Sequence, residues 1–155
     1  MEEKKQGVVL QAIPYLDKGR ILKVFSRESG MVSLMAKKKT LPSLAPFCIA
    51  ECIYKTRQSD LGMLIDASLI DSLVDLRKSY EILTTAGSMA QDLLRSQLPG
   101  KASPGLYDLL CSYFKKLPEF HNPDVLSASF QLKLLLHDGL LALADECALC
   151  GKPAS

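Results

Sequence analysis

Residues 7–39, GVVLQAIPYLDKGRILKVFSRESGMVSLMAKKK, contain three short runs of alternating apolar residues and end in a cluster of lysines. The second run covers residues 21–25 and the third covers residues 31–36. Short turns that end in Gly19 and Gly30 separate the runs. Strands rich in β-branched residues that are separated by glycine-containing turns of this length are typical of hairpins. The stretch therefore predicts a three-stranded antiparallel meander.

Two further strands follow a proline-bounded loop at residues 41–46. Residues 47–55 alternate between two sets of side chains, and the pattern leaves open which set faces inward. Residues 62–67 form the fifth apolar run, after a polar turn. Five short strands in about seventy residues predict a five-stranded antiparallel Greek-key barrel of the OB-fold type. A five-stranded SH3-like barrel fits the same pattern.

From residue 72 onward the spacing of apolar residues changes from two to about 3.6, which predicts helices. Leu-Pro-Gly at residues 98–100 ends the first helix, and Ser103 followed by Pro104 begins the second. Residues 125–137 are apolar on nearly every side, so we expect a third helix at the centre of a bundle. The chain is therefore predicted to be an α+β protein. Its barrel domain would be residues 1–71, and a small α-helical domain would be residues 72–155.

Positive charge is concentrated in the first part of the chain. Residues 1–39 hold nine Lys and Arg against four Asp and Glu, although the formal net charge of the whole chain is only +2. Several cations along one groove bind a phosphate backbone by releasing its counterions. We therefore predict a DNA-binding face made by Arg20, Lys23, Arg27, Lys37, Lys38 and Lys39. The alternative is a solvated loop that keeps a sheet edge from aggregating.

Aromatic residues suited to base stacking are scarce in the barrel, where the candidates are Tyr15, Phe25, Phe47 and Tyr54. Phe25 and Phe47 are expected in the core. The predicted binding is therefore electrostatic and independent of sequence, rather than based on stacking.

Motifs of the common enzyme classes are missing from the sequence: we find no Walker loop, glycine-rich fingerprint, paired carboxylates or Ser/His/Asp set. His137 lies in an apolar helical stretch and is expected to be a buried, hydrogen-bonded histidine. The charged N-terminus lacks a secretory signal, and charges interrupt the most apolar window at residues 132–143. We therefore expect a non-enzymatic cytoplasmic protein that makes no membrane contact.

Five cysteines are present, and in a cytosolic chain they are expected to stay reduced. Cys48 and Cys52 fall on the same side of a strand and are expected in the core. Cys147 and Cys150 form a CxxC knuckle of the kind that holds zinc, but a structural zinc site takes four ligands. The sequence thus offers half of a zinc site, or a metal-free remnant of one.

Six short motifs follow one another along nearly the whole chain. The first three are Gly-Val-Val-Leu at residues 7–10, Phe-Ser-Arg-Glu-Ser-Gly at residues 25–30 and Met-Ala-Lys at residues 35–37. The others are Leu-Ala-Pro-Phe at residues 44–47, Phe-Gln-Leu-Lys-Leu-Leu at residues 130–135 and Cys-Ala-Leu-Cys-Gly at residues 147–151. In the order and spacing of these motifs, rather than in any single one, the sequence resembles the RecO family of bacterial recombination mediators.

The resemblance implies an N-terminal OB-fold, a helical domain, DNA binding without chemistry, and promotion of strand annealing and recombinase loading. The implied partners are single-stranded DNA, with duplex DNA as a second candidate, the single-strand DNA-binding protein and RecR. Members of the family usually continue past residue 155, and many carry a second cysteine pair that completes a zinc site. The sequence therefore resembles a short member or a fragment of a longer one.

A contact with the single-strand DNA-binding protein would need a hydrophobic groove with a cationic rim, because the tail of that partner is acidic. The candidate rim residues are Lys115, Lys116 and Lys133, which could equally be ordinary surface lysines. The competing hypothesis for the whole chain is a protein-interaction or scaffold module that does not bind DNA. A zinc- or thiol-dependent enzyme is a third hypothesis, and it rests on the CxxC pair alone.

Overall fold

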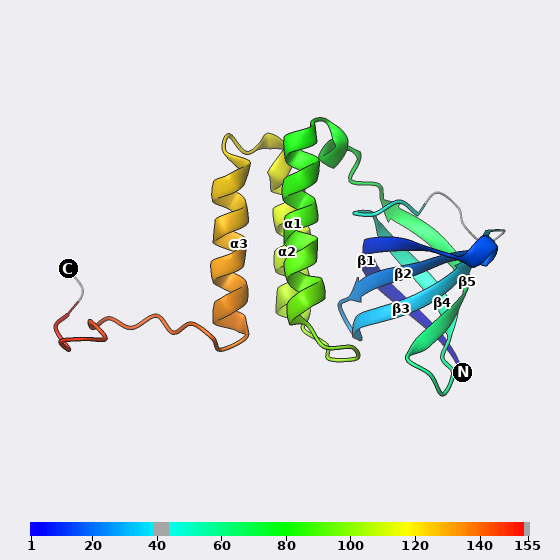
Figure 1. The fold of residues 1–155 in the computed structure, drawn as a ribbon, viewed down its shortest axis with the longest axis horizontal. Coiled ribbons are helices and arrows are strands. Elements are labelled where there is room, and N and C mark those ends of the chain that lie inside the picture. The colour runs from blue at the N-terminus through cyan, green and yellow to red at the C-terminus, as the bar shows by residue number, and fades with distance from the viewer. Residues whose placement is uncertain (39–43, 154–155) are drawn as a thin grey trace.

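The computed structural model describes residues 1–38 and 44–153. It contains five strands followed by three α-helices (Figure 1). The strands are β1 (Glu2–Tyr15), β2 (Gly19–Ser26), β3 (Gly30–Lys37), β4 (Ile49–Lys55) and β5 (Leu61–Asp71). The helices are α1 (Tyr80–Ser96), α2 (Pro104–Lys116) and α3 (Pro123–His137). The α+β prediction, a barrel followed by a small helical unit, is confirmed.

The sheet closes into a barrel in the order β1-β2-β3-β5-β4. Every neighbouring pair is antiparallel except β3 and β5, which run parallel from Ser33 opposite Leu61 to Met35 opposite Met63. The barrel is therefore mixed, whereas the sequence predicted it to be antiparallel. The crossover that makes β3 and β5 neighbours is the Greek-key connection of an OB-fold.

The barrel interior is filled by alternate residues of its strands. On β4 the inward set is Cys48, Ala50, Cys52 and Tyr54, each at most 3% exposed. This burial shows which set of side chains faces inward, a point that the sequence left open, and it confirms Cys48 and Cys52 as core residues. Burial raises the pKa of Cys52 to about 11, so this thiol stays protonated and inert at neutral pH.

Strand β1 begins at Glu2, earlier than the apolar pattern indicates, because its first four residues are charged. Its first half pairs with β4 and its second half pairs with β2. Lys4 forms an ion pair with Glu51 at 2.9 Å, and Glu2 forms one with Lys55 at 3.3 Å. Lys4 thus lies on the β1–β4 side of the barrel, whereas Lys5 forms an ion pair at 3.0 Å with Glu28 in the turn between β2 and β3.

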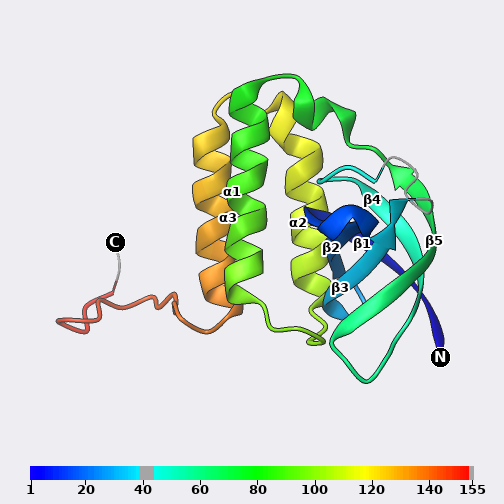
Figure 2. The same cartoon turned by 45° about the vertical axis from the view of Figure 1, so that its right-hand side comes forward.

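Helix α2 packs against the barrel, with α3 on the far side of α1 (Figure 2). Phe25 of β2 lies 6.3 Å from Tyr107 of α2 between ring centroids, and Phe47 meets Phe114 edge to face at 5.7 Å. One buried cluster includes Val8 and Phe25 of the barrel together with residues of all three helices. The barrel and the helices therefore share a hydrophobic core.

The expectation that residues 125–137 form a central helix was wrong. Helix α3 buries one stripe, which includes Leu126, Phe130 and Leu134, and its opposite side exposes Val125, Leu132 and Leu135 by 40–55%. Only one side of α3 is covered by the other helices (Figures 1 and 2), so apolar residues elsewhere on it face solvent.

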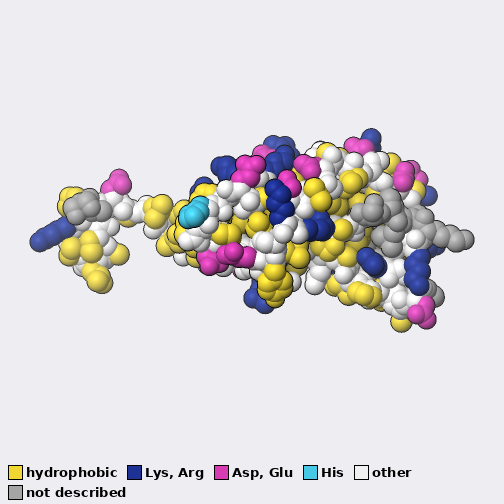
Figure 3. Space-filling model, turned by 90° about the horizontal axis from the view of Figure 1, so that it is seen from above, with side chains coloured by type: hydrophobic (Ala, Val, Ile, Leu, Met, Phe, Trp, Pro, Cys, Tyr) yellow, Lys and Arg dark blue, Asp and Glu magenta, His cyan; other side chains and the backbone are white. Residues whose placement is uncertain are grey.

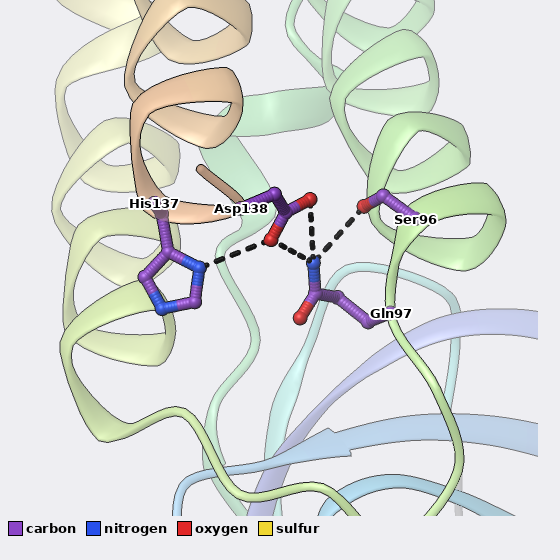
Figure 4. Close-up of polar contacts among 4 residues, drawn as sticks. All are labelled: Ser96, Gln97, His137 and Asp138. Atoms are coloured by element: carbon purple, nitrogen blue, oxygen red, sulfur yellow. Dashed lines mark hydrogen bonds and ion pairs between the residues drawn. The ribbon is translucent and has the colours of Figure 1, made fainter. Parts of the chain in front are cut away.

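The C-terminal ends of α1 and α3 are joined by a small polar cluster (Figure 4). The Gln97 side-chain amide donates hydrogen bonds to both carboxylate oxygens of Asp138, at 3.1 and 3.3 Å. His137 Nδ1 lies 3.1 Å from the same carboxylate. His137 is hydrogen-bonded as expected, but its side chain is 38% exposed rather than buried, because it lies at the end of the outer helix.

Beyond α3 the chain reaches away from the helices and carries hydrophobic side chains with it (Figure 3). Across residues 1–38 and 44–153, the structure contains no helix that is both long and apolar enough to cross a membrane.

Candidate nucleic-acid interface

Strand register defines one outer surface on the first three strands of the barrel. Three rows cross from β1 through β2 to β3: Gln11–Lys23–Ser33, Ile13–Ile21–Met35 and Tyr15–Gly19–Lys37. The alternate residues of these strands, such as Leu22, Val24, Leu34 and Ala36, are buried inside the barrel. Since successive residues of a strand point to opposite sides, the three rows share the outer side. We call this surface the β1–β3 face.

Two predicted DNA-binding residues, Lys23 and Lys37, lie on the β1–β3 face. The Lys23 ammonium donates a 2.6 Å hydrogen bond to the Ser33 hydroxyl in the same row, which fixes the charge over the sheet. Lys37 lies two rows away, roughly 13 Å along the strands at a rise of about 3.3 Å per residue. Lys38 follows Lys37 and is exposed. Lys39 lies outside the described residues.

The two predicted arginines lie elsewhere on the barrel. Arg20 is opposite Pro14 and Ala36, in phase with the inward-facing Leu22, and is exposed near the start of β2. Arg27 lies in the turn between β2 and β3, where its guanidinium pairs with Asp108 of α2. Hydrogen bonding and charge from Asp108 raise the pKa of Arg27 above its ordinary value. The structure thus places Lys23 and Lys37 on one face, Arg20 in the opposite phase at the start of β2, and Arg27 against α2.

Apolar side chains occupy the β1–β3 face among the lysines, and of these reasoning from the sequence named only Tyr15, as a candidate for base stacking. Ile13 is 39% exposed and Tyr15 is 43% exposed, while Ile21 and Met35 are half-buried. Strand alternation alone suggests core positions for Ile13, Ile21 and Met35. The spacing from the lysines could have revealed these positions, because Ile21 lies two residues from Lys23 and Met35 lies two residues from Lys37. Ile13 and Tyr15 pair with Ile21 and Gly19 in the strand register.

The three lysines predicted to contact a partner protein do not form one rim. The Lys133 ammonium lies 5.1 Å from the ring centroid of Tyr113. Burial raises the pKa of Tyr113, but hydrogen bonds from Lys133 and Ser129 and the charges of Lys133 and Lys116 together lower it below its ordinary value. Lys116 and Lys133 therefore share Tyr113. Lys115 instead lines a pocket with Leu76, Phe114 and the carboxylates of Asp71, Asp75 and Glu119.

The CxxC pair forms a tight knuckle in the exposed C-terminal segment. Gly151 donates a backbone hydrogen bond to the carbonyl of Cys147, and Cys147 donates one to the carbonyl of Lys152. Backbone amides of Cys150 and Leu149, followed by the Cys150 thiol, lower the pKa of Cys147. Thiolates in such a turn can ligate a metal, but no group of three or more potential ligands occurs within the residues that the structure describes. The described residues fit half of a zinc site.

An OB-type barrel with cations on an outer strand face is typical of nucleic-acid-binding proteins. Comparison with known families shows which class of nucleic-acid-binding protein this chain belongs to. The model for "Recombination protein O N terminal" matches residues 1–73, and the model for "Recombination protein O C terminal" matches residues 77–155. The chain belongs to the RecO family of DNA repair proteins, which confirms the resemblance noted in its sequence.

Curated relatives bear the name DNA repair protein RecO. The protein of Chlamydia trachomatis serovar D is 34% identical over 153 residues, covering 95% of this chain and 63% of the relative. That of Exiguobacterium sibiricum is 29% identical over 160 residues, covering 97% and 63%, and that of Bacillus cereus is 27% identical over 155 residues, covering 97% and 62%. The chain therefore spans a little over 60% of the length of these relatives.

Proposed function

We propose that this chain is a non-enzymatic mediator of DNA repair and recombination that binds single-stranded DNA on the β1–β3 face. The observation that carries the proposal is that Lys23 and Lys37 lie on the same outer face, with Lys38 beside them. Each phosphate that a lysine neutralises releases counterions, so such a face binds a nucleic acid backbone regardless of sequence. Arg20, at the start of β2, is a further candidate contact, and so is Lys39, which lies outside the described residues.

Binding of this kind would promote strand annealing, because cations on the protein reduce the repulsion between two complementary strands. We propose recombinase loading as the role of the chain in repair, in the bacterial cytoplasm at the nucleoid. Single-stranded DNA, the single-strand DNA-binding protein and RecR are the proposed partners, and duplex DNA is a second substrate. Membership of the RecO family supports these assignments, as do its relatives' names, which place them in DNA repair.

The competing function is a protein-interaction module, and one observation favours it. Helix α3 exposes Val125, Leu132 and Leu135 on its outer side. Exposed apolar stripes on a helix often mark protein contacts. This role is compatible with DNA binding, because the exposed apolar side of α3 and the β1–β3 face belong to different parts of the fold (Figure 1).

A salt titration of DNA binding tests the proposal. Anisotropy of a labelled oligo-dT would be measured at several salt concentrations for the wild type and for the Lys23→Ala/Lys37→Ala/Lys38→Ala variant. Since each phosphate contact on single-stranded DNA contributes about 0.7 to the slope of log K against log salt, the slope should fall by about 2.

The matched control is Lys55→Ala/Lys78→Ala/Lys101→Ala, which removes three exposed lysines elsewhere. The control should keep the wild-type slope. No binding by the wild type at low salt, or an equal loss in both triple variants, would contradict the proposal.

A further inference from the structure

The centre of the β1–β3 face is apolar, although cations flank it. Ile13, Ile21 and Met35 form the middle row across the three strands, between the row that contains Lys23 and the row that contains Lys37. Tyr15 lies in the latter row and is 43% exposed. Because the contacts of a phosphate backbone are polar, binding to phosphates alone does not account for exposed apolar residues on this face.

The row that contains Tyr15 has a glycine at its centre. Its middle residue is Gly19, which is buried and places no side chain between Tyr15 of β1 and Lys37 of β3. Gly19 has a φ of 157°, and a Cβ there would collide with the carbonyl oxygen of Ala36. The backbone therefore requires glycine at this position, so β2 contributes no side chain beside Tyr15.

A second exposed apolar residue follows Tyr15 directly. Leu16 is 72% exposed and has a φ of 49°, a left-handed conformation that is unfavourable for leucine. Leu16 lies in the connection from β1 to β2, one of the loops that contribute to nucleic acid binding in OB-folds. The apolar surface thus extends from the middle row to the β1–β2 connection.

We propose that Tyr15 stacks on one unpaired nucleobase, that Ile13, Ile21 and Met35 form the apolar floor beside it, and that this platform makes the face prefer single-stranded over duplex DNA. The inference rests on the proposed function. Aromatic rings bind bases of any sequence through their π faces, while Lys23 and Lys37 on either side bind the adjoining phosphates. In a duplex the bases are stacked on one another and cannot reach the sheet. Stacking thereby adds to the purely electrostatic binding that the sequence predicted.

The absence of tryptophan from the chain allows a direct test. A Tyr15→Trp variant carries a single indole on the face. Its fluorescence should be quenched by oligo-dT and much less by an oligonucleotide of equal length and charge that consists of abasic sites. Equal quenching by both oligonucleotides would overturn the proposal, because phosphates alone would then account for the contact.

Binding by Tyr15→Ala and Tyr15→Phe provides the second arm. Loss of stacking should weaken oligo-dT binding by about 5- to 100-fold in Tyr15→Ala, whereas Tyr15→Phe should bind almost as the wild type does. Duplex affinity and the salt slope should change little in either variant. If Tyr15→Ala keeps the wild-type affinity for oligo-dT and the wild type binds with a steep salt dependence, the platform is refuted and the proposed function stands. If the wild type binds no DNA, both fail.

Discussion

The guanidinium of Arg27 and the carboxylate of Asp108 form two parallel hydrogen bonds, from Nε to Oδ1 at 3.1 Å and from Nη2 to Oδ2 at 3.2 Å. This pair joins the β2–β3 turn to helix α2 beside the contact between Phe25 and Tyr107. Both side chains are more than half exposed, so the pair orients the barrel on the helices more than it stabilises them.

We expect the pair with Asp108 to hold Arg27 away from DNA. Arg27→Ala should therefore leave the salt slope of oligo-dT binding unchanged, and its effect on thermal stability should be small and equal to that of Asp108→Ala. The measurements are a salt titration of anisotropy and thermal unfolding of the two single variants and the double variant. A fall in the slope of about 0.7 in Arg27→Ala would instead identify Arg27 as a phosphate contact, as its sequence suggested.

The edge-to-face contact of Phe47 and Phe114 should be essential to the shared core. Phe114 is fully buried, so Phe114→Ala should lower the free energy of unfolding by about 3–5 kcal/mol. Chemical denaturation monitored by circular dichroism measures this. Phe120, which is 42% exposed, is the matched control, and Phe120→Ala should change the free energy by less than about 1 kcal/mol. Equal effects of the two substitutions would mean that the barrel and helices do not share a core.

The Gln97–Asp138 contact should hold the ends of α1 and α3 together. Gln97 is 8% exposed, so Asp138→Ala leaves a buried amide with only the Ser96 hydroxyl as acceptor, and it should cost about 1–2 kcal/mol of stability. Removing both partners in Gln97→Leu/Asp138→Ala should cost less than the sum of the single changes. Asp145→Ala, in the exposed C-terminal segment, is the control. Additive losses in the double variant would show that the two side chains act independently.

The cysteine thiols of the knuckle should react faster than those inside the barrel. The pKa of Cys147 is lowered, so a larger fraction of this thiol is ionised at neutral pH than for an ordinary cysteine. Reaction with a disulfide reagent should therefore be fast at Cys147 in the native protein, and Cys48 and Cys52 should react only on unfolding. The pH dependence of alkylation in a Cys150→Ser variant measures the Cys147 thiol, and Cys147→Ser is its control. A midpoint at or above the ordinary thiol pKa would contradict the inferred backbone contacts.

Local patterns in the sequence were sufficient for the five strands and for the start of α2. Period-two alternation, the glycines of the turns and Pro104 at the start of α2 are short-range signals, and each marks a feature that the structure contains. The start of α1 was not placed, because helical spacing from residue 72 includes the 3-10 turn Val74–Arg77 that precedes Tyr80. The parallel pairing of β3 with β5 depends on residues about thirty positions apart, and alternation does not encode direction.

Long-range packing also explains the differences at α3 and at the candidate interface. The apolar composition of α3 indicated burial, but burial depends on how many neighbours surround a helix, and α3 has the other helices on one side only. Arg27 and Lys23 are four residues apart and appeared equivalent. In the fold, Arg27 pairs with Asp108 and Lys23 lies on the β1–β3 face. Tertiary contacts decide this difference, and local sequence patterns do not contain them.

The location of bound DNA is the most direct test of whether the β1–β3 face is the DNA-binding surface. Backbone amide shifts of the ¹⁵N-labelled protein would be followed by NMR during titration with oligo-dT. We predict that the largest changes fall on the β1–β3 face, at Ile13 and Tyr15 of β1, Ile21 and Lys23 of β2, and Met35 and Lys37 of β3. Changes confined to the helices, or to the Glu2–Lys55 side of the barrel, would contradict it.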